Sequence, residues 1–154
     1  MSNRIDQINV VVKDVDAATQ FLVQLGIDLP AAPPGWGMHH RTIPTATSLH
    51  GGHDLESPTF GIDLDSVAFA QQWGGLDPSF TGVVLNVRVD ERDEVDRLHD
   101  SAQAIGGRSL KSPHDAFWGS RYAVVEGPAS VFVGLMSVPD PARRSAPPNP
   151  DSFA

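Results

Sequence analysis

The chain has 154 residues, 40% of them hydrophobic and 19% charged, which is the composition of one globular domain or of two small modules sharing a core. A formal net charge of −8 at pH 7 argues against nucleic acid or an anionic membrane surface as a partner. The absence of cysteine excludes disulfides, thiol nucleophiles and thiolate metal ligands. Because no signal-like or membrane-spanning apolar run is present, we expect a cytoplasmic protein.

The first predicted elements are a strand and a helix. Apolar Ile8, Val10 and Val12 alternate with their neighbours, which predicts a strand with one apolar face. A helix follows, capped by Asp14 or Asp16. Its expected buried stripe is Ala17, Ala18, Phe21, Leu22 and Leu25, and Gly26 ends it.

The rest of the first half is more broken. The expected segments are a loop at 29–37, one or two short strands within 38–49, a polar turn at 50–58, a strand at 59–65, a short helix at 66–73 and a linker at 74–79. In the strand at 59–65, Ile62 and Leu64 are expected to face one way, and Asp63 and Asp65 the other.

The second half repeats this order. A strand at 83–89 and a helix at 91–105 correspond to the first strand and helix, with an offset of 77 residues that aligns Val12 with Val89. Three further strands are predicted at 108–112, 122–126 and 131–136. The order indicates an internal βαβββ repeat.

Two stretches carry a resemblance to a known family. Near the end, Trp118-Gly119-x-Arg121 precedes a strand, a Gly127-Pro128 turn and a last apolar strand. The opening stretch at 8–26 has a matching first strand and helix. Together they resemble the vicinal oxygen chelate superfamily, which includes glyoxalase I, bleomycin-resistance proteins and extradiol dioxygenases.

The resemblance implies an α+β fold in which two βαβββ modules form curved mixed sheets around a cleft. The domain is expected to span 1–141, with module one at about 4–66, a linker at about 67–80 and module two at about 81–138. The Pro-rich segment 142–154 is interpreted as a flexible tail, with a docked segment anchored by Phe153 as the alternative.

If helices cover one face of each sheet, the opposite faces line the cleft. Strand alternation predicts the lining as Gln7, Asn9, Val11, Asp63, Asp65, Val84, Asn86, Arg88, Phe132, Gly134 and Met136. Such a polar lining is costly in a closed core but suits a cleft that holds a ligand. A pairing of Asp63 or Asp65 with Arg88 is the purely structural alternative.

Enzymes of the family hold a divalent metal with side chains from four strands. The resemblance places these positions at Gln7, Asp63, Val84 and Gly134. Since two of the four supply no donor, no metal and no cofactor are expected. His39, His40, His50 and His53 lie close in sequence, and a loop chelate is the alternative to solvated side chains. His99 is expected at the surface.

Aromatic side chains favour binding over catalysis. A Trp ring beside Arg121 at a strand entrance can stack on and hydrogen-bond to a ligand. The predicted ligand-binding residues are Gln7, Asn9, Trp36, Asp63, Asn86, Arg88, Trp118 and Arg121.

Two functional hypotheses follow from these residues. In the first, the protein binds a small, partly aromatic molecule in a metal-free cleft. In the second, it is a metal-dependent glyoxalase, isomerase or dioxygenase with a rearranged site using Gln7, Asp63 and a loop histidine. In either case a homodimer is expected, because one chain covers the sheet edges poorly.

Overall fold

The computed structural model describes residues 3–45 and 60–153, and it has the predicted α+β architecture. Within these residues the strands are β1 (Arg4–Val12), β2 (His40–Ile43), β3 (Gly61–Ser66), β4 (Gly82–Val89), β5 (Arg108–Asp115), β6 (Arg121–Glu126) and β7 (Phe132–Ser137). The α-helices are α1 (Val15–Gln24), α2 (Val67–Gly74) and α3 (Arg92–Ala104). No helix of the described part is long and apolar enough to span a membrane.

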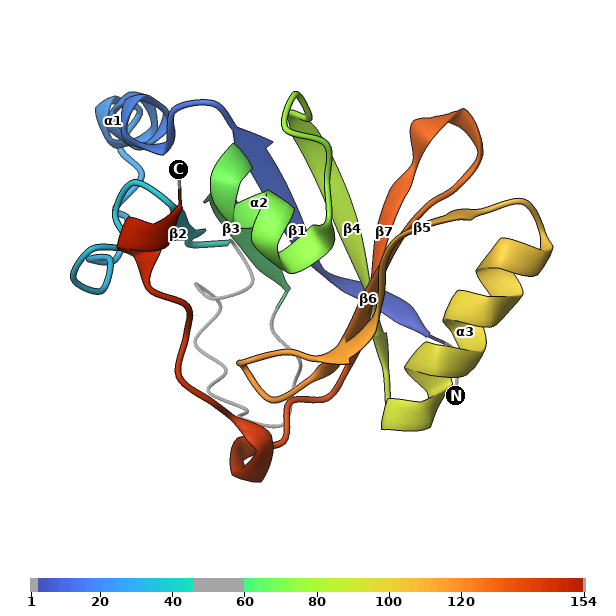
Figure 1. Cartoon of the computed structure of the whole chain (residues 1–154). Coiled ribbons are helices and arrows are strands. Elements are labelled where there is room, and N and C mark those ends of the chain that lie inside the picture. The colour runs from blue at the N-terminus through green and yellow to red at the C-terminus, as the bar shows by residue number, and fades with distance from the viewer. Residues whose placement is uncertain (1–2, 46–59, 154) are drawn as a thin grey trace.

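The strands form one twisted mixed sheet in the order β2-β3-β1-β4-β7-β6-β5 (Figure 1). The first half of the chain supplies β2, β3 and β1, and the second half supplies β4, β7, β6 and β5. The second half has three strands after its helix, as predicted. The first half has two within the described residues, and the predicted polar turn at 50–58 lies outside them.

The two halves meet at an antiparallel pair that preserves the repeat. Ile8 on β1 lies opposite Leu85 on β4, and the predicted offset of 77 carries the first residue onto the second. The same offset relates the two flanking pairs to each other. It carries Gln7 onto Val84 and Asn9 onto Asn86, and in the sheet Gln7 lies opposite Asn86 and Asn9 lies opposite Val84. The repeat is therefore a local twofold relation about the centre of the sheet.

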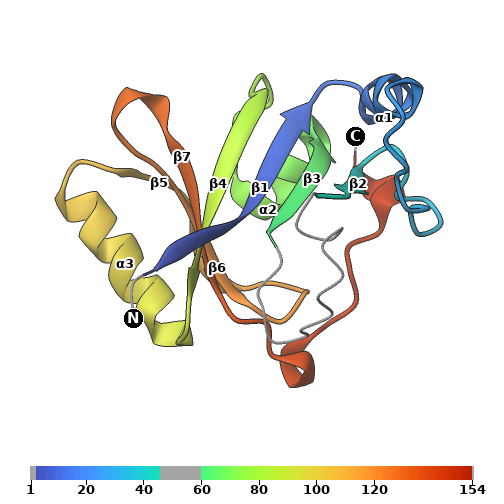
Figure 2. The ribbon, with the colours of Figure 1, turned by 180° about the vertical axis from the view of Figure 1, so that it is seen from behind.

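The helices of the two halves pack differently. In the second half, α3 lies over β5, β6 and β7, where Val95 is fully buried (Figure 2). In the first half, Asp14 caps α1 as predicted, accepting a hydrogen bond from the Ala17 amide at 2.9 Å. The expected buried stripe of α1 is wrong, because Phe21 is 62% and Leu25 64% exposed. Its buried residues are Val15 and Thr19.

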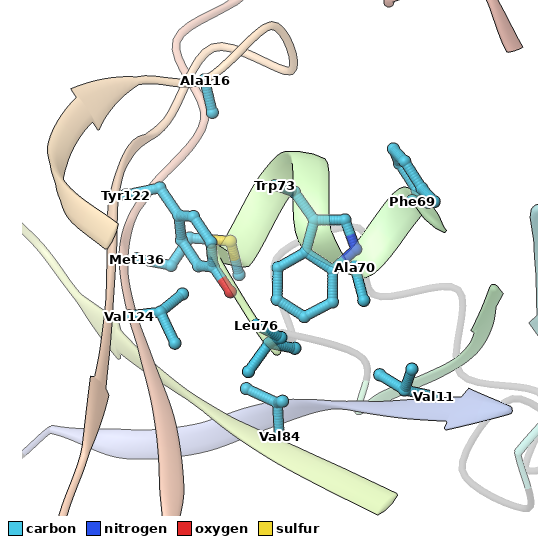
Figure 3. Packing of buried hydrophobic residues seen from close by; sticks show 10 residues of the cluster. All are labelled: Val11, Phe69, Ala70, Trp73, Leu76, Val84, Ala116, Tyr122, Val124 and Met136. Atoms are coloured by element: carbon cyan, nitrogen blue, oxygen red, sulfur yellow. The ribbon is translucent and has the colours of Figure 1, made fainter. Parts of the chain in front are cut away.

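Helix α2 packs against the opposite face of the sheet and completes the main core. Ser66 caps α2 by accepting from the Phe69 amide at 3.1 Å, and Gly75 ends it with φ 62°. A side chain at position 75 would meet the Leu110 carbonyl oxygen at 2.2 Å, so the turn requires glycine. The core residues around α2 are Val11, Phe69, Ala70, Trp73, Leu76, Val84, Ala116, Tyr122, Val124 and Met136 (Figure 3).

The C-terminal segment runs back along the molecule to the side of β2 (Figure 1). The Ser145 amide donates to the Phe117 carbonyl at 3.0 Å. The Phe153 ring lies 5.5 Å from Phe69 and 5.8 Å from Trp36, measured between ring centroids. This is the docked arrangement, in which Phe153 anchors the segment against the α2 side of the sheet.

Candidate functional site

A pocket of about 440 Å³ lies on the face of the sheet that carries α2. Its polar lining comes from the strands and its apolar lining mainly from loops and α2. The lining residues are Gln7, Asn9, Pro33, Trp36, His40, Asp63, Asp65, Phe69, Trp73, Asn86, Arg88, Phe117, Trp118, Tyr122, Met136, Pro139 and Pro147.

Seven of the eight residues proposed from the sequence line this pocket. They are Gln7, Asn9, Trp36, Asp63, Asn86, Arg88 and Trp118. Strand alternation puts the five strand residues among them on one face, and strand pairing brings these together, since Asn9 is the register partner of both Asp63 on β3 and Val84 on β4. Val84 lies in the core next to the pocket and is fully buried.

Arg121 is the exception, because its side chain points away from the pocket. Its guanidinium pairs with Asp96 on α3 at 3.0 Å and with Asp115 on β5 at 3.4 Å. Neighbouring residues of a strand face opposite sides of the sheet. Tyr122 therefore faces the pocket instead, and the predicted pairing of Trp118 with Arg121 is wrong.

A chain of hydrogen bonds crosses the pocket floor. The Tyr122 hydroxyl donates to Asn86 Oδ1 at 2.9 Å, and Asn86 Nδ2 donates to Asn9 Oδ1 at 2.6 Å. Asn9 Nδ2 donates to Asp65 Oδ2, and Asp65 Oδ1 lies next to His40 Nδ1, each at 2.6 Å. The floor is thus a continuous polar network that runs from β6 to β2.

Asp63 lies beside this chain and binds a different partner. Gln7 Nε2 donates to Asp63 Oδ2 at 2.6 Å. Burial raises the pKa of Asp63 above its ordinary value, with His40 opposing the shift and Asp65 adding to it. Burial lowers the pKa of His40, but the hydrogen bond to Asp65 and the charge of Asp65 outweigh it, so that pKa is raised.

Arg88 does not pair with Asp63 or Asp65, which was the structural alternative to a ligand-binding cleft. Its Nε lies 2.8 Å from Asp6 Oδ2. The β1–β4 register shifts between Ile5 and Gln7, so Asp6 sits in an irregularity of the strand. Asp6 is only 8% exposed, and its pairing with Arg88 leaves the carboxylates of β3 without an arginine partner.

The apolar part of the pocket is built from aromatic rings. Trp118 packs edge-on against Tyr122 at 5.2 Å, and Trp36 packs edge-on against Phe69 at 4.9 Å. Trp73 lies 6.1 Å from Tyr122 and carries an indole nitrogen visible in Figure 3. These rings surround a concave space whose floor is polar.

The lining also includes residues that the sequence did not place in the cleft, among them His40, Phe69, Trp73 and Tyr122. Phe69 and Trp73 are four residues apart on α2, a spacing that places both on one helix face. That signal was available, but nothing local showed that α2 would cross the cleft. Tyr122 follows from the alternation that sends Arg121 to the other face.

Of the four positions at which the resemblance places metal ligands, only Gln7 and Asp63 carry a donor side chain. Val84 supplies no donor atom. At Gly134, a Cβ would lie 2.0 Å from Asn86 Oδ1 and 2.5 Å from the Tyr122 hydroxyl, so a longer ligand side chain does not fit. Within residues 3–45 and 60–153, no group of three or more His, Asp or Glu side chains is placed to hold a metal ion.

The histidines fall into separate settings. His39 Nδ1 lies 3.0 Å from Ser66 Oγ, whereas His50 and His53 are outside the described residues, so the loop chelate is not described. His99 is only 5% exposed, with Nε2 2.7 Å from Ser109 Oγ, so its expected surface position is wrong. It is buried because α3 packs its β5-facing side against the sheet.

Comparisons with known proteins agree with this architecture. The family model described as Glyoxalase/Bleomycin resistance protein/Dioxygenase superfamily matches residues 4–135. A comparison with curated proteins gave no match.

Similar solved structures share the fold at low identity. The Mn(II)-bound glyoxalase from Novosphingobium aromaticivorans gives a TM-score of 0.56 at 18% identity, covering 95% of this chain and 44% of that one. A protein titled NAD-dependent benzaldehyde dehydrogenase from Legionella pneumophila gives 0.55 at 14% identity, covering 89% of this chain and 99% of that one. A superfamily member from Vibrio splendidus 12B01 gives 0.52 at 13% identity, with coverages of 89% and 100%. At these identities the likeness shows the fold alone.

Proposed function

Because the chain belongs to the glyoxalase/bleomycin resistance protein/dioxygenase superfamily, we propose that its pocket binds a small, partly aromatic organic molecule without a metal ion. The observation that carries the proposal is the set of aromatic side chains around a polar, hydrogen-bonded floor. A volume of about 440 Å³ suits a molecule of metabolite size, since ligand cavities measure roughly 300–1,000 Å³.

The aromatic side chains favour a planar ligand group. Trp36, Trp73 and Trp118 come from three separate segments and all line the pocket. Rings that pack edge-on against one another still present faces and edges on which a further ring can stack. The floor amides of Asn9 and Asn86 then give orientation through hydrogen bonds.

The metal-free part of the proposal rests on the donor set. Val84 and Gly134 supply no side-chain donor, and the space beside Gly134 is filled by Asn86 and Tyr122. Gln7 and Asp63 remain, and they are already hydrogen-bonded to each other. One amide oxygen and one carboxylate are fewer ligands than a divalent ion requires.

The proposal is tested by titrating the protein with planar aromatic compounds and following tryptophan fluorescence and thermal unfolding. Binding raises the apparent unfolding temperature by mass action. Trp118→Ala is expected to weaken binding by roughly 1–3 kcal/mol. Phe21→Ala, an exposed ring on α1, is the matched control and leaves binding unchanged. Equal binding by Trp118→Ala and the parent would place the ligand elsewhere.

One observation favours a metal-dependent enzyme as the second candidate. His40 Nε2 lies 4.0 Å from Asp63 Oδ1, so a strand histidine reaches the region of the remaining Gln7 and Asp63. Elemental analysis of untagged protein, with titration of zinc, nickel, manganese and iron(II), decides between the candidates. Near-stoichiometric metal that is lost in both His40→Ala and Asp63→Ala would establish the second candidate.

We further propose that two copies form a homodimer through the face of the sheet on which β1, β3 and β4 carry no helix (Figure 2). Apolar side chains of these strands are exposed, with Val83 on β4 45% exposed and Ile5 on β1 43% exposed. A second copy would remove these side chains from water.

A further inference from the structure

We propose that the pocket selects an organic cation, an ammonium or amidinium group joined to an aromatic body, whose charge lies against Asp63 and Asp65. This inference deepens the binding function proposed above and rests on it. It names the charge class of the ligand, which the aromatic lining alone leaves open.

The floor carries two carboxylates that have no strong counter-charge within residues 3–45 and 60–153. Asp65 is fully buried and the Asp63 side chain is 15% exposed. Among the described residues no lysine or arginine forms an ion pair with either, and the one basic partner is His40, an imidazole. Two carboxylates held by at most one imidazolium leave the floor negative.

The remaining partners of these carboxylates are neutral. Gln7 and Thr42 provide hydrogen bonds to Asp63, and Asn9 provides one to Asp65. Neutral amide and hydroxyl donors orient a carboxylate but do not cancel its charge. A buried charge without a full counter-charge costs free energy, and a ligand cation would supply the missing partner.

Arg88 does not neutralise the floor, although it lines the pocket. Its Nε is 2.8 Å from Asp6, which is itself 8% exposed. The charge of Arg88 is therefore matched by a carboxylate outside the Asp63–Asp65 pair. Among the described residues, an anionic ligand would therefore face two carboxylates, with the one arginine of the lining already paired to Asp6.

The aromatic walls suit the same charge class. A cation over the face of Trp or Tyr within about 6 Å of the ring centre is attracted by the ring electrons. Trp36, Trp73, Trp118 and Tyr122 all line the pocket that holds the two carboxylates. Carboxylates and indole rings together attract a cation through two separate interactions.

Two buried indole N–H groups add a further feature of the ligand. Trp73 Nε1 and Trp118 Nε1 have no hydrogen-bond partner within the described part of the chain. Buried donors of this kind are normally satisfied. A hydroxyl or carbonyl oxygen on the aromatic body would accept from one of them.

Three probes of one shape test the inference. Tyramine, tyrosol and 4-hydroxyphenylacetate share a phenol and a two-carbon arm and differ in carrying a cationic, a neutral or an anionic end. Calorimetric titration at pH 7.5 and low salt is expected to show tyramine binding at least about tenfold tighter than tyrosol, and 4-hydroxyphenylacetate binding weakest.

The variants separate charge from shape. Asp63→Asn keeps the size of the side chain and is expected to reduce the preference for tyramine to less than about threefold. Asp28→Asn, an exposed carboxylate outside the pocket, is the matched control and keeps the parent order. The ranking of the three probes on the parent protein needs no variant, so it decides the inference even if Asp63→Asn folds poorly.

The outcomes distinguish the preference for a cation from the proposed binding of an aromatic molecule, on which it rests. If tyrosol or 4-hydroxyphenylacetate binds as tightly as tyramine, the inference is overturned and the aromatic pocket remains. An unchanged tyramine preference in folded Asp63→Asn also overturns it. No response to any of the three at about millimolar concentration overturns the proposed pocket as well.

Discussion

The two halves of the chain share one strand–helix pattern and use it differently. In the second half, α3 covers β5, β6 and β7 and buries Val95 completely. In the first half, the corresponding α1 makes few contacts with the sheet and leaves Phe21, Val23 and Leu25 more than half exposed. Figure 2 shows β1, β3 and β4 with no helix in front of them, whereas α3 lies across the other end of the sheet.

The halves also differ on the pocket side. The first half supplies the charged residues of the floor, His40, Asp63 and Asp65. The second half supplies Asn86, Tyr122 and Trp118, together with Gly134 where a longer side chain would not fit. The helix of the second half is the more closely packed, whereas the first half leaves α1 exposed and supplies both carboxylates of the pocket.

The largest expected effect concerns the helix-free face of β1, β3 and β4 (Figure 2). Val83→Asp puts a charge into the proposed interface twice, once from each copy, and should weaken association at least about hundredfold. Light scattering is expected to give a dimer mass for the parent at micromolar concentration and a monomer mass for the variant. Val131→Asp, which is 40% exposed in the turn before β7, is the control and stays dimeric. A parent of monomer mass contradicts the prediction.

The contrast between the helices is tested by one substitution made in each. Val95→Ala in α3 removes fully buried methyl groups and should lower the free energy of unfolding by about 2 kcal/mol. Val23→Ala in α1, where the residue is 54% exposed, should change it by less than about 0.5 kcal/mol. Urea unfolding of both variants in the Val83→Asp background checks this without a contribution from dimerisation. Equal losses would show that α1 is packed in solution as closely as α3.

The difference between the two sides of the pocket floor is tested at glycines. Gly134→Ala places a Cβ against Asn86 and Tyr122 and should cost about 1–3 kcal/mol of unfolding free energy. Gly61→Ala places a Cβ 3.6 Å from Gln7 Cγ, an ordinary contact, and should be tolerated. Denaturant unfolding measures both variants. A Gly134→Ala variant as stable as the parent would mean that Asn86 and Tyr122 can move to make room for the methyl group at little cost in free energy.

The smallest expected effect is a difference in pH dependence between His40 and His114. The folded-state pKa of His40 is raised, so its contribution to stability is present below about pH 6.5 and is lost as pH rises through the folded pKa. Burial lowers the pKa of His114, so its contribution is present above about pH 6.5 and is lost as pH falls through the folded pKa. Measured between pH 5 and pH 9 and compared with the parent, the unfolding free energies of the two variants should therefore depart in opposite ways. The loss in His40→Asn should be larger at low pH, and the loss in His114→Asn should be larger at high pH. Parallel changes would contradict the assigned environments.

Local patterns in the sequence determined most of the sheet and much of the pocket floor. The alternation in β1, β3 and β4 has a period of two residues, so it showed which side chains share a face before any partner strand was known. For the same reason Gln7, Asn9, Asp63, Asn86 and Arg88 were correctly placed together. The offset of 77 residues also aligns Ile8 with Leu85, and the structure shows that these two residues lie opposite each other where the halves meet.

Tertiary structure decided which polar groups meet and which surfaces are covered. The bonds from Gln7 to Asp63 and from Asn9 to Asp65 each join residues 56 positions apart, and strand register selects them, not any local pattern. Arg88 pairs with Asp6 because Asp6 lies at an irregularity of β1. Arg121 pairs with Asp96 because α3 packs on the face of the sheet to which Arg121 points. An apolar stripe predicts that one side of a helix packs against another element, but it does not identify that element. The sequence therefore did not show that the apolar side chains of α1 remain exposed, whereas α2 and Phe153 pack on the pocket side of the sheet.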